Sequence, residues 1–153
     1  MNRVLKLHKT LIKLPFGKRL FSLAVARIAP YFLTIKPTIE DIRPNAITVS
    51  MKKRPAVYNH LKTVHAIASC NLCEFAAGVV MEASIPKHLR WIPKGMELSY
   101  PAKADSDLVC EAISDPSTWV PGDLPIKVTA RRKDGTAVVE GVIKLWISEK
   151  PKR

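Results

Sequence analysis

The chain has 153 residues, of which 47% are hydrophobic and 25% charged, a composition that fits one folded domain and excludes a disordered chain. No run of about 18 or more apolar residues occurs, so we expect no membrane-spanning helix. The net charge of +12 favours an anionic partner; nucleic acid, acidic lipid and a phosphorylated ligand all fit it.

Residues 1–35 form a basic segment that we expect to precede a domain of residues 36–150. Before the first acid, Glu40, the chain carries eight Lys or Arg (Arg3, Lys6, Lys9, Lys13, Lys18, Arg19, Arg27 and Lys36). Apolar residues recur there at helical spacing, and Pro15-Phe16-Gly17 predicts a break between two short helices. Two interpretations stay open: the helices pack on the domain, or residues 1–30 bind a membrane surface or a partner.

The three cysteines, an odd number, and the lack of a secretory signal predict a reducing compartment and a cytoplasmic protein. A basic N-terminus without acids is also typical of a mitochondrial transit segment, although this one is poor in Ser. Cys70 and Cys73 have the C-x-x-C spacing of metal and redox sites. No further ligands accompany them at suitable spacing, so we expect buried thiols and no metal.

After the basic segment the sequence alternates between strand and helix patterns. Residues 32–51 are rich in Ile, Val and Thr and contain a turn signal at 43–46, which predicts two strands. A long apolar helix follows from about residue 66 to residue 83. Further strands are predicted at Trp91–Tyr100, Leu108–Ser114, Ile126–Arg131 and Ala137–Ser148, with an Asp-Gly hairpin turn between the last two. This order predicts an α+β fold in which a curved antiparallel sheet wraps around one long helix, with extra N-terminal helices.

The predicted central helix is apolar on nearly every side, yet it contains one carboxylate, Glu74. An unpaired buried carboxylate costs several kcal/mol, so Glu74 either pairs with a base, is protonated, or lines a cleft where charge is required. His65 falls at the helix start, where free N–H groups can hold a carbonyl oxygen. The two residues are about 2.5 turns apart, so one helix cannot bring them together, whereas a dimer with antiparallel helices could place one helix start opposite the other protomer's Glu74.

The spacing around these residues resembles that of hotdog-fold thioesterases of the phenylacetic-acid-degradation type. Their pattern of Asn, His and an acid reads here N59-H-L-K-T-V-H65-A-I-A-S-C-N-L-C-E74. The segments Leu98–Leu108 and Val128–Lys144 also resemble that family, so the likeness covers roughly residues 36–148. It implies a hotdog fold, homodimers or dimers of dimers joined at sheet edges, and hydrolysis of acyl-CoA thioesters at the dimer interface.

The resemblance implies a role for each matching residue. Glu74 would be the general base for water or the nucleophile that forms an anhydride. Asn59 would position the water or the thioester, and His65 would order the turn before the helix. The N–H groups of Ala66 and Ile67 would bind the carbonyl oxygen. The family has paired glycines in place of Ala66-Ile67 and often a hydroxyl residue one turn after the acid. These departures leave a non-catalytic acyl-CoA- or lipid-binding protein as the alternative.

The cluster Arg131-Arg132-Lys133 beside the hairpin turn has two interpretations, a solvated hairpin tip or a clamp for the phosphates of CoA. Lys94 is a further candidate for the clamp. CoA would enter as part of the substrate, and we expect no other cofactor. The bases are not interleaved with aromatic residues and no nucleic-acid motif is found, so nucleic acid is not the expected partner.

Overall fold

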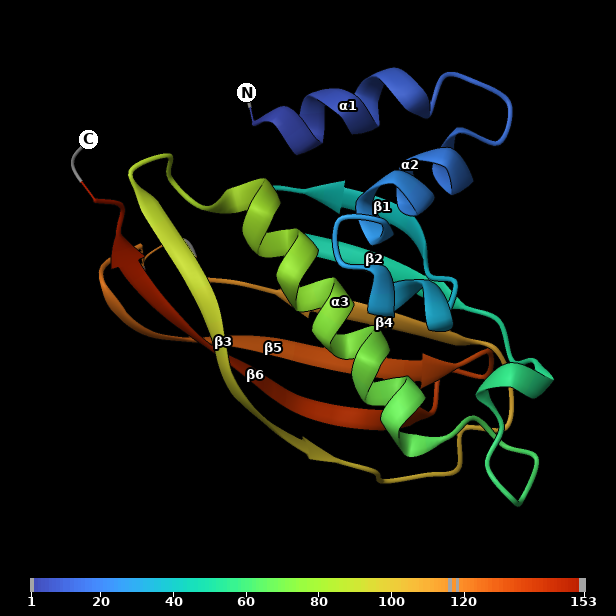
Figure 1. Ribbon diagram of the computed structural model, residues 1–153. Coiled ribbons are helices and arrows are strands. Elements are labelled where there is room, and N and C mark those ends of the chain that lie inside the picture. The colour runs from blue at the N-terminus through green and yellow to red at the C-terminus, as the bar shows by residue number, and fades with distance from the viewer. Residues whose placement is uncertain (1, 116, 118, 152–153) are drawn as a thin grey trace.

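The computed structural model describes residues 2–115, 117 and 119–151, and its centre is an antiparallel six-stranded sheet curved around one long helix (Figure 1). The strands lie side by side in the order β1-β2-β4-β5-β6-β3. The expected α+β architecture, with additional N-terminal helices, is confirmed. The elements are α1 (Arg3–Leu11), α2 (Gly17–Ala26), η1 (Pro30–Thr34), β1 (Thr38–Arg43), β2 (Ala46–Met51), η2 (Pro55–Val57), α3 (Ala66–Ser84), β3 (Leu89–Ser99), β4 (Leu108–Ile113), β5 (Gly122–Arg132) and β6 (Ala137–Glu149).

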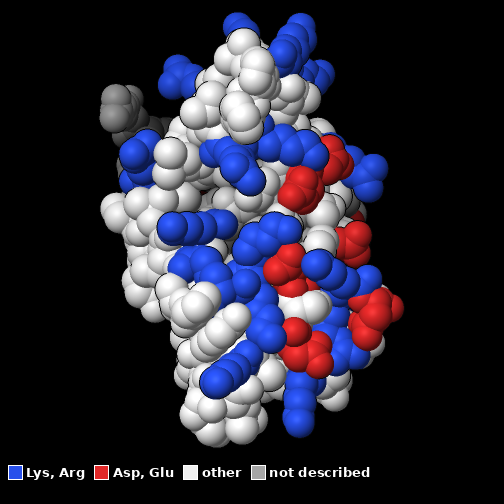
Figure 2. All heavy atoms as spheres, turned by 90° about the vertical axis from the view of Figure 1, so that its right-hand side faces the viewer, with Lys and Arg blue, Asp and Glu red and all other residues white. Residues whose placement is uncertain are grey.

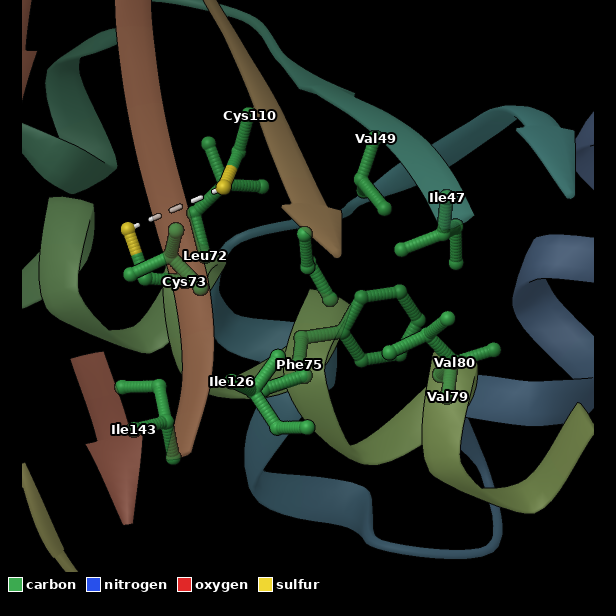
Figure 3. Packing of buried hydrophobic residues seen from close by; sticks show 14 of the residues in the cluster. Ile47, Val49, Leu72, Cys73, Phe75, Val79, Val80, Cys110, Ile126 and Ile143 are labelled. Atoms are coloured by element: carbon green, nitrogen blue, oxygen red, sulfur yellow. Dashed lines mark hydrogen bonds between the residues drawn. The ribbon is translucent and has the colours of Figure 1, made fainter. Parts of the chain in front are cut away.

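The core lies between α3 and the concave face of the sheet. Figure 3 shows Leu72, Phe75 and Val80 of α3 among side chains from β2, β4, β5 and β6, and all three are fully buried. Full burial stabilises each such side chain by about 1.5–3 kcal/mol, so packing against the sheet holds the helix in place. By length and mean hydropathy α3 could also cross a membrane. Its burial inside the domain identifies it as the core helix instead.

A pair of thiols lies within this core. Cys110 of β4 donates a hydrogen bond to Cys73 of α3, with the two Sγ atoms 3.7 Å apart (Figure 3). Both side chains are fully buried, and burial contributes to raising the pKa of Cys110, after its hydrogen bond to Cys73. Within the described residues no group of three or more His, Cys, Asp or Glu side chains converges as a metal site would require.

The sheet does not cover α3 on every side within one chain, although the helix is apolar on nearly every side. Along one stripe of the helix Ile67 and Glu82 are exposed, and Glu74 and Gly78 are half-buried between them. Successive positions are seven, four and four residues apart, which is two helical turns and then one turn each, so they share one face. The open stripe of α3 is the feature from which the candidate site is built.

The N-terminal helices pack on the same domain. Phe21 of α2 is fully buried, and the Ser22 hydroxyl accepts a hydrogen bond of 2.7 Å from the Ile39 N–H of β1. Asn2 caps α1 by accepting from the Val4 N–H, and its side-chain amide donates to the Glu82 carbonyl at the end of α3. The division of the chain into residues 1–35 and 36–150 stays a prediction.

Two strand boundaries differ from the sequence prediction. The strand pattern was expected from Phe32, but residues 30–34 form the 3-10 helix η1, because proline at its start fixes φ and favours a helical turn. The strand expected from Ile126 begins at Gly122, so β5 pairs with β6 over a longer stretch. Neither difference changes α3, whose observed start and end agree with the prediction.

Strand β3 forms one edge of the sheet and depends on a glycine in its neighbour. Gly141 of β6 lies opposite Leu98 and has a φ of +152°, a value that favours glycine. A Cβ atom added to Gly141 would lie 2.0 Å from the Glu97 carbonyl oxygen, so no other residue fits without moving β3. The position of β3, and with it the wall beside the open stripe of α3, therefore rests on this contact.

Candidate active site at the central helix

Glu74 lies in the middle of the open stripe of α3 and is half-buried. Its carboxylate makes no hydrogen bond or ion pair within the described part of the chain. The first explanation for Glu74, a structural ion pair with a base of the same protomer, is thus not what the described residues show. The other carboxylate of the stripe, Glu82, differs because it accepts a hydrogen bond of 2.8 Å from the indole Nε1 of Trp91.

The end of the stripe nearer the helix C-terminus is closed by Trp91 of β3. A Cβ on Gly78 would lie 3.3 Å from the Trp91 ring, so the indole packs directly over this glycine. Gly78 is one turn after Glu74, at the position where a hydroxyl residue was sought. The Glu74 carboxylate therefore has the Trp91 indole on the side of the helix C-terminus. On its other side, the stripe stays open toward the start of the helix.

His65 caps the start of α3. The His65 side-chain Nδ1 accepts a hydrogen bond of 3.1 Å from the Ile67 N–H, and the His65 backbone N–H donates to the Val57 carbonyl over 2.8 Å. These two hydrogen bonds hold the turn before the helix, and a role of His65 in the reaction stays a prediction. The Ile67 N–H is occupied by the cap, whereas the Ala66 N–H has no acceptor within the described residues. Of the two N–H groups that the resemblance assigns to the carbonyl oxygen, only that of Ala66 is free among the described residues.

Asn59 lies in the loop before α3, and its side chain holds that loop together. The Oδ1 atom accepts from the N–H groups of Leu61 and Thr63 at 2.9 and 3.1 Å. The Nδ2 group donates to the Thr63 hydroxyl at 2.8 Å. These bonds make Asn59 a loop-ordering residue in the free protein, and its expected contact with water or thioester stays a prediction.

A cavity of about 270 Å³ opens at the start of α3. Its lining includes His65, Ile67 and Asn71 from the helix region and the aromatic residues Tyr31 and Tyr58. Asn71 is 6% exposed; its Nδ2 donates to the Thr34 hydroxyl, and its Oδ1 has no partner among the described residues. A buried acceptor without a donor carries a free-energy cost that a water or ligand N–H or O–H would remove. The cavity therefore offers an acceptor, an adjacent helix start and aromatic walls.

The separation along α3 decides how Glu74 and the helix start can cooperate. His65 and Glu74 are nine residues apart, which corresponds to about 13.5 Å along a helix axis. No single thioester carbonyl can contact both groups of one protomer. Within one protomer, Glu74 and the helix start are therefore two separate groups.

Tyr100 and Cys70 form a further polar pair next to Glu74. The Cys70 Sγ and the Tyr100 hydroxyl share a hydrogen bond of 2.8 Å. Cys70 precedes Glu74 by one turn, and Tyr100 follows the last residue of β3. The hydrogen bond and partial burial raise the pKa of Tyr100 to about 12, and burial raises the pKa of Cys70. The shared hydrogen bond thus holds the Tyr100 hydroxyl against α3, one turn before Glu74.

Replacing Cys70 by Ala is expected to lower the pKa of Tyr100 from about 12 toward its ordinary value of 10. The shared hydrogen bond is the largest cause of the rise, and the change removes it. Titration of the tyrosinate absorbance in the wild type and the variant measures this shift. The matched control is Cys110→Ala, which removes a buried thiol that does not contact Tyr100. An equal shift in both variants, or none in either, would contradict the assignment.

The four basic residues expected to bind the phosphates of CoA do not form one cluster. Arg132 is held by Asp134 and Asp105 at 2.7 and 3.2 Å, and Lys133 lies 3.6 Å from Asp107. Arg131 has no ion pair within the described chain and bonds only to the Gly135 carbonyl. Lys94 pairs with Asp123 and lies about 25 Å along β6 from the hairpin, so it cannot bind the same phosphate.

The hairpin tip and the start of α3 lie at the same end of the sheet. The Arg132 guanidinium donates to the Lys103 carbonyl at 3.4 Å, and the Val64 N–H donates to the neighbouring Ala104 carbonyl at 2.8 Å. Residues 131–133 are therefore placed near the helix start, whereas Lys94 is not. Sequence reasoning missed Asn71 and Tyr100 as site residues. The helical spacing of Asn71 from both Ile67 and Glu74 was the signal that could have found it.

Solved structures establish which fold class this is. A Pseudomonas aeruginosa protein of unknown function, described as a probable thioesterase, is 17% identical with a TM-score of 0.77, over 90% of this chain and 97% of that one. A thioesterase from Haemophilus influenzae is 9% identical with a TM-score of 0.71, over 80% and 85% of the two chains. Such low identities establish the fold alone, and the expected hotdog fold is confirmed.

The family is defined by sequence. Residues 17–147 match the domain of unknown function DUF4442, and the chain belongs to this family. A structural-genomics protein, APC5556, is 36% identical with a TM-score of 0.83, over 96% of this chain and 99% of that one. No curated protein matches the chain. The resemblance to hotdog-fold thioesterases is therefore confirmed for the fold.

Proposed function

We propose that this protein hydrolyses acyl-CoA thioesters at active sites shared between the protomers of a homodimer, or of a dimer of such dimers. The observation that supports this most is Glu74, a carboxylate without a partner among the described residues, on the open stripe of an otherwise apolar helix. Partial burial of an unpaired carboxylate lowers the stability of the folded protein, so a functional role explains its presence better than packing does. A partly desolvated carboxylate is well suited to act as a general base.

The dimer is supported by the edge of the sheet. β3 is an eleven-residue edge strand with exposed apolar side chains such as Ile92 and Met96. A long edge with unpaired backbone groups and apolar side chains is a site for pairing with another chain. Antiparallel pairing of two β3 strands would also bring two α3 stripes together. A twofold axis there would place Glu74 of one protomer opposite the helix start of the other.

The proposed reaction uses groups from both protomers. Glu74 takes a proton from water as the water oxygen attacks the thioester carbon, and the charge on the carbonyl oxygen faces the Ala66 N–H of the other protomer. The C–S bond then breaks, and the sulfur leaves with the proton that Glu74 had taken. The products are a carboxylic acid and the free thiol of CoA. Arg131 and Lys133 at the hairpin tip would contact the CoA phosphates.

A specific observation favours the alternative, a non-catalytic acyl-CoA-binding protein. The Ile67 N–H is held by the His65 side chain, and the Ile67 side chain is 58% exposed where paired glycines would leave open backbone. One free N–H at Ala66 supports weaker oxyanion binding than two would. A panel of acyl-CoA thioesters that bind without releasing thiol would select this alternative.

The test of the shared site is complementation between two inactive variants. Glu74→Gln removes the proposed base, and Ala66→Pro removes the free N–H at the first helical position, where proline is tolerated. His65 already has an extended backbone, with ψ of 138°, so it accepts a following proline. Thiol release is measured for each variant alone and after the two are unfolded and refolded together.

A shared site predicts recovery, because each mixed dimer contains one site with both wild-type groups. Random mixing then restores about a quarter of the wild-type activity. Sites contained within one protomer predict no recovery, since every such site lacks one group. The absence of recovery in mixtures whose dimers have been verified would refute the shared site.

A further inference from the structure

The outward face of α2 carries apolar side chains that are exposed to solvent. Leu20, Leu23 and Ala24 are exposed at helical spacing, and Ile28 continues the same stripe just after the helix with 85% of its side chain exposed. The opposite face already supplies the contact with the domain, through Phe21 and its neighbours. The second apolar face of α2 is thus not used to pack the helix on the domain, which indicates a site of interaction with another surface.

The turn between α1 and α2 extends this apolar surface. Phe16 has a φ of +60°, a conformation that nonglycine residues seldom adopt, and its side chain is 75% exposed. Gly17 is buried, and a Cβ there would lie 1.8 Å from the Leu11 carbonyl oxygen, so the tight turn is fixed by its backbone. Leu14, one of the residues before it, is half-exposed. The fold thus presents an aromatic ring at the tip of a rigid turn.

The same surface is basic and lies beside a cavity. Arg19, Lys36, Lys52 and Arg54 line a cavity of about 460 Å³, together with Leu23 of the apolar stripe, and no carboxylate lines it. Arg19, Lys36 and Arg54 form no ion pair within the described residues. Figure 2 shows Lys and Arg from the top to the bottom of this face with uncharged surface between them, and Asp and Glu mainly toward one side.

We propose that the α1–α2 region docks on the surface of an anionic phospholipid bilayer. The stripe Leu20, Leu23, Ala24 and Ile28, with Phe16 at the turn, would enter the boundary between headgroups and acyl chains. The basic cavity beside it would hold a lipid phosphate. Amphipathic segments with bases flanking an apolar face bind such surfaces by burying apolar area and by attraction to anionic lipid.

Charge complementarity selects the bilayer over a second copy of the chain. The first 39 residues contain eight Lys or Arg and no Asp or Glu, and the whole chain carries +12. Two such surfaces pressed together would place like charges opposite each other. An anionic bilayer offers an apolar layer and negative charge at once, which matches both properties of this face.

The test is cosedimentation of the full chain with vesicles of phosphatidylcholine, with and without phosphatidylglycerol. We expect binding to the anionic vesicles that weakens as salt is added, and little binding to phosphatidylcholine alone. The double variant Leu20→Ser/Leu23→Ser is expected to reduce binding about tenfold or more. Its matched control, Ile113→Ser, changes an equally exposed apolar side chain on β4 and should bind as the wild type does.

A second pair of variants tests the charge. Arg19→Gln/Lys36→Gln should weaken binding to anionic vesicles about tenfold or more, whereas Lys87→Gln/Lys127→Gln, which removes the same charge elsewhere, should leave most of it. Equal losses from both pairs would mean attraction by net charge alone and would overturn the proposed surface. A self-associated species that Leu20→Ser/Leu23→Ser dissociates would assign the face to a second copy instead. Both pairs of variants lie outside the proposed catalytic groups, so they are expected to leave the hydrolysis of soluble acyl-CoA unchanged whether or not they bind vesicles.

Discussion

Glu74→Gln is expected to lower kcat for thioester hydrolysis about a hundredfold or more and to leave the fold intact. The amide has nearly the same shape as the carboxylate but cannot accept a proton at neutral pH. The side chain is half-buried without a partner, so the change breaks no hydrogen bond or ion pair of the described protomer. The release of CoA thiol under saturating substrate measures kcat directly.

The matched control for this prediction is Glu82→Gln. Glu82 lies two turns further along the same stripe, and its carboxylate accepts a hydrogen bond from Trp91 rather than facing open surface. An amide oxygen can accept the same bond, so activity close to that of the wild type is expected. If both variants lose activity equally, the loss results from removing a negative charge from the stripe and not from removing a base at Glu74. If neither does, Glu74 is not the base.

Gly141→Ala is expected to destabilise the protein by about 3 kcal/mol or more. The new methyl group would lie 2.0 Å from the Glu97 carbonyl oxygen, and the φ of +152° is strained for any residue with a Cβ. Relief requires β3 to move away from β6, which breaks backbone hydrogen bonds of the sheet. Urea unfolding followed by circular dichroism measures the loss as a lower midpoint.

Gly95→Ala serves as its control. Gly95 lies on β3 at the register shift after Pro93, and a Cβ there meets nothing within 4 Å. A change of less than about 0.5 kcal/mol is expected at such a surface position. Because β3 is the proposed dimer edge, Gly141→Ala should also weaken self-association. An unchanged midpoint in Gly141→Ala would show that the sheet accommodates the methyl group, contrary to the geometry.

The central helix was predictable because its signal is local. An apolar run of helical length, with His65 before it, gave both ends of α3 to within a residue or two. The hairpin between β5 and β6 was predictable for the same reason, since Asp134-Gly135 specifies a tight turn. Placing Glu74 on this helix was therefore possible from the sequence alone.

The features that sequence reasoning could not give depend on contacts between distant residues. The open stripe exists because the sheet and η1 leave one side of α3 uncovered, which no local pattern encodes. The pairing of Arg132 with Asp105 joins residues 27 positions apart, and the bond between Cys70 and Tyr100 spans 30. The separation of Lys94 from the hairpin follows from strand register, which the sequence constrains only weakly.

The strand order also determines when this protein can fold as it is synthesised. β6 comes last among the six strands in the chain, yet it lies inside the sheet between β5 and β3. Until the ribosome has released β6, the β3 strand has no neighbour in the sheet and α3 lacks part of its cover. From the synthesis of α3 until the release of β6, a nascent chain thus exposes a helix apolar enough to resemble a membrane anchor, which is the kind of transient apolar surface that chaperones bind.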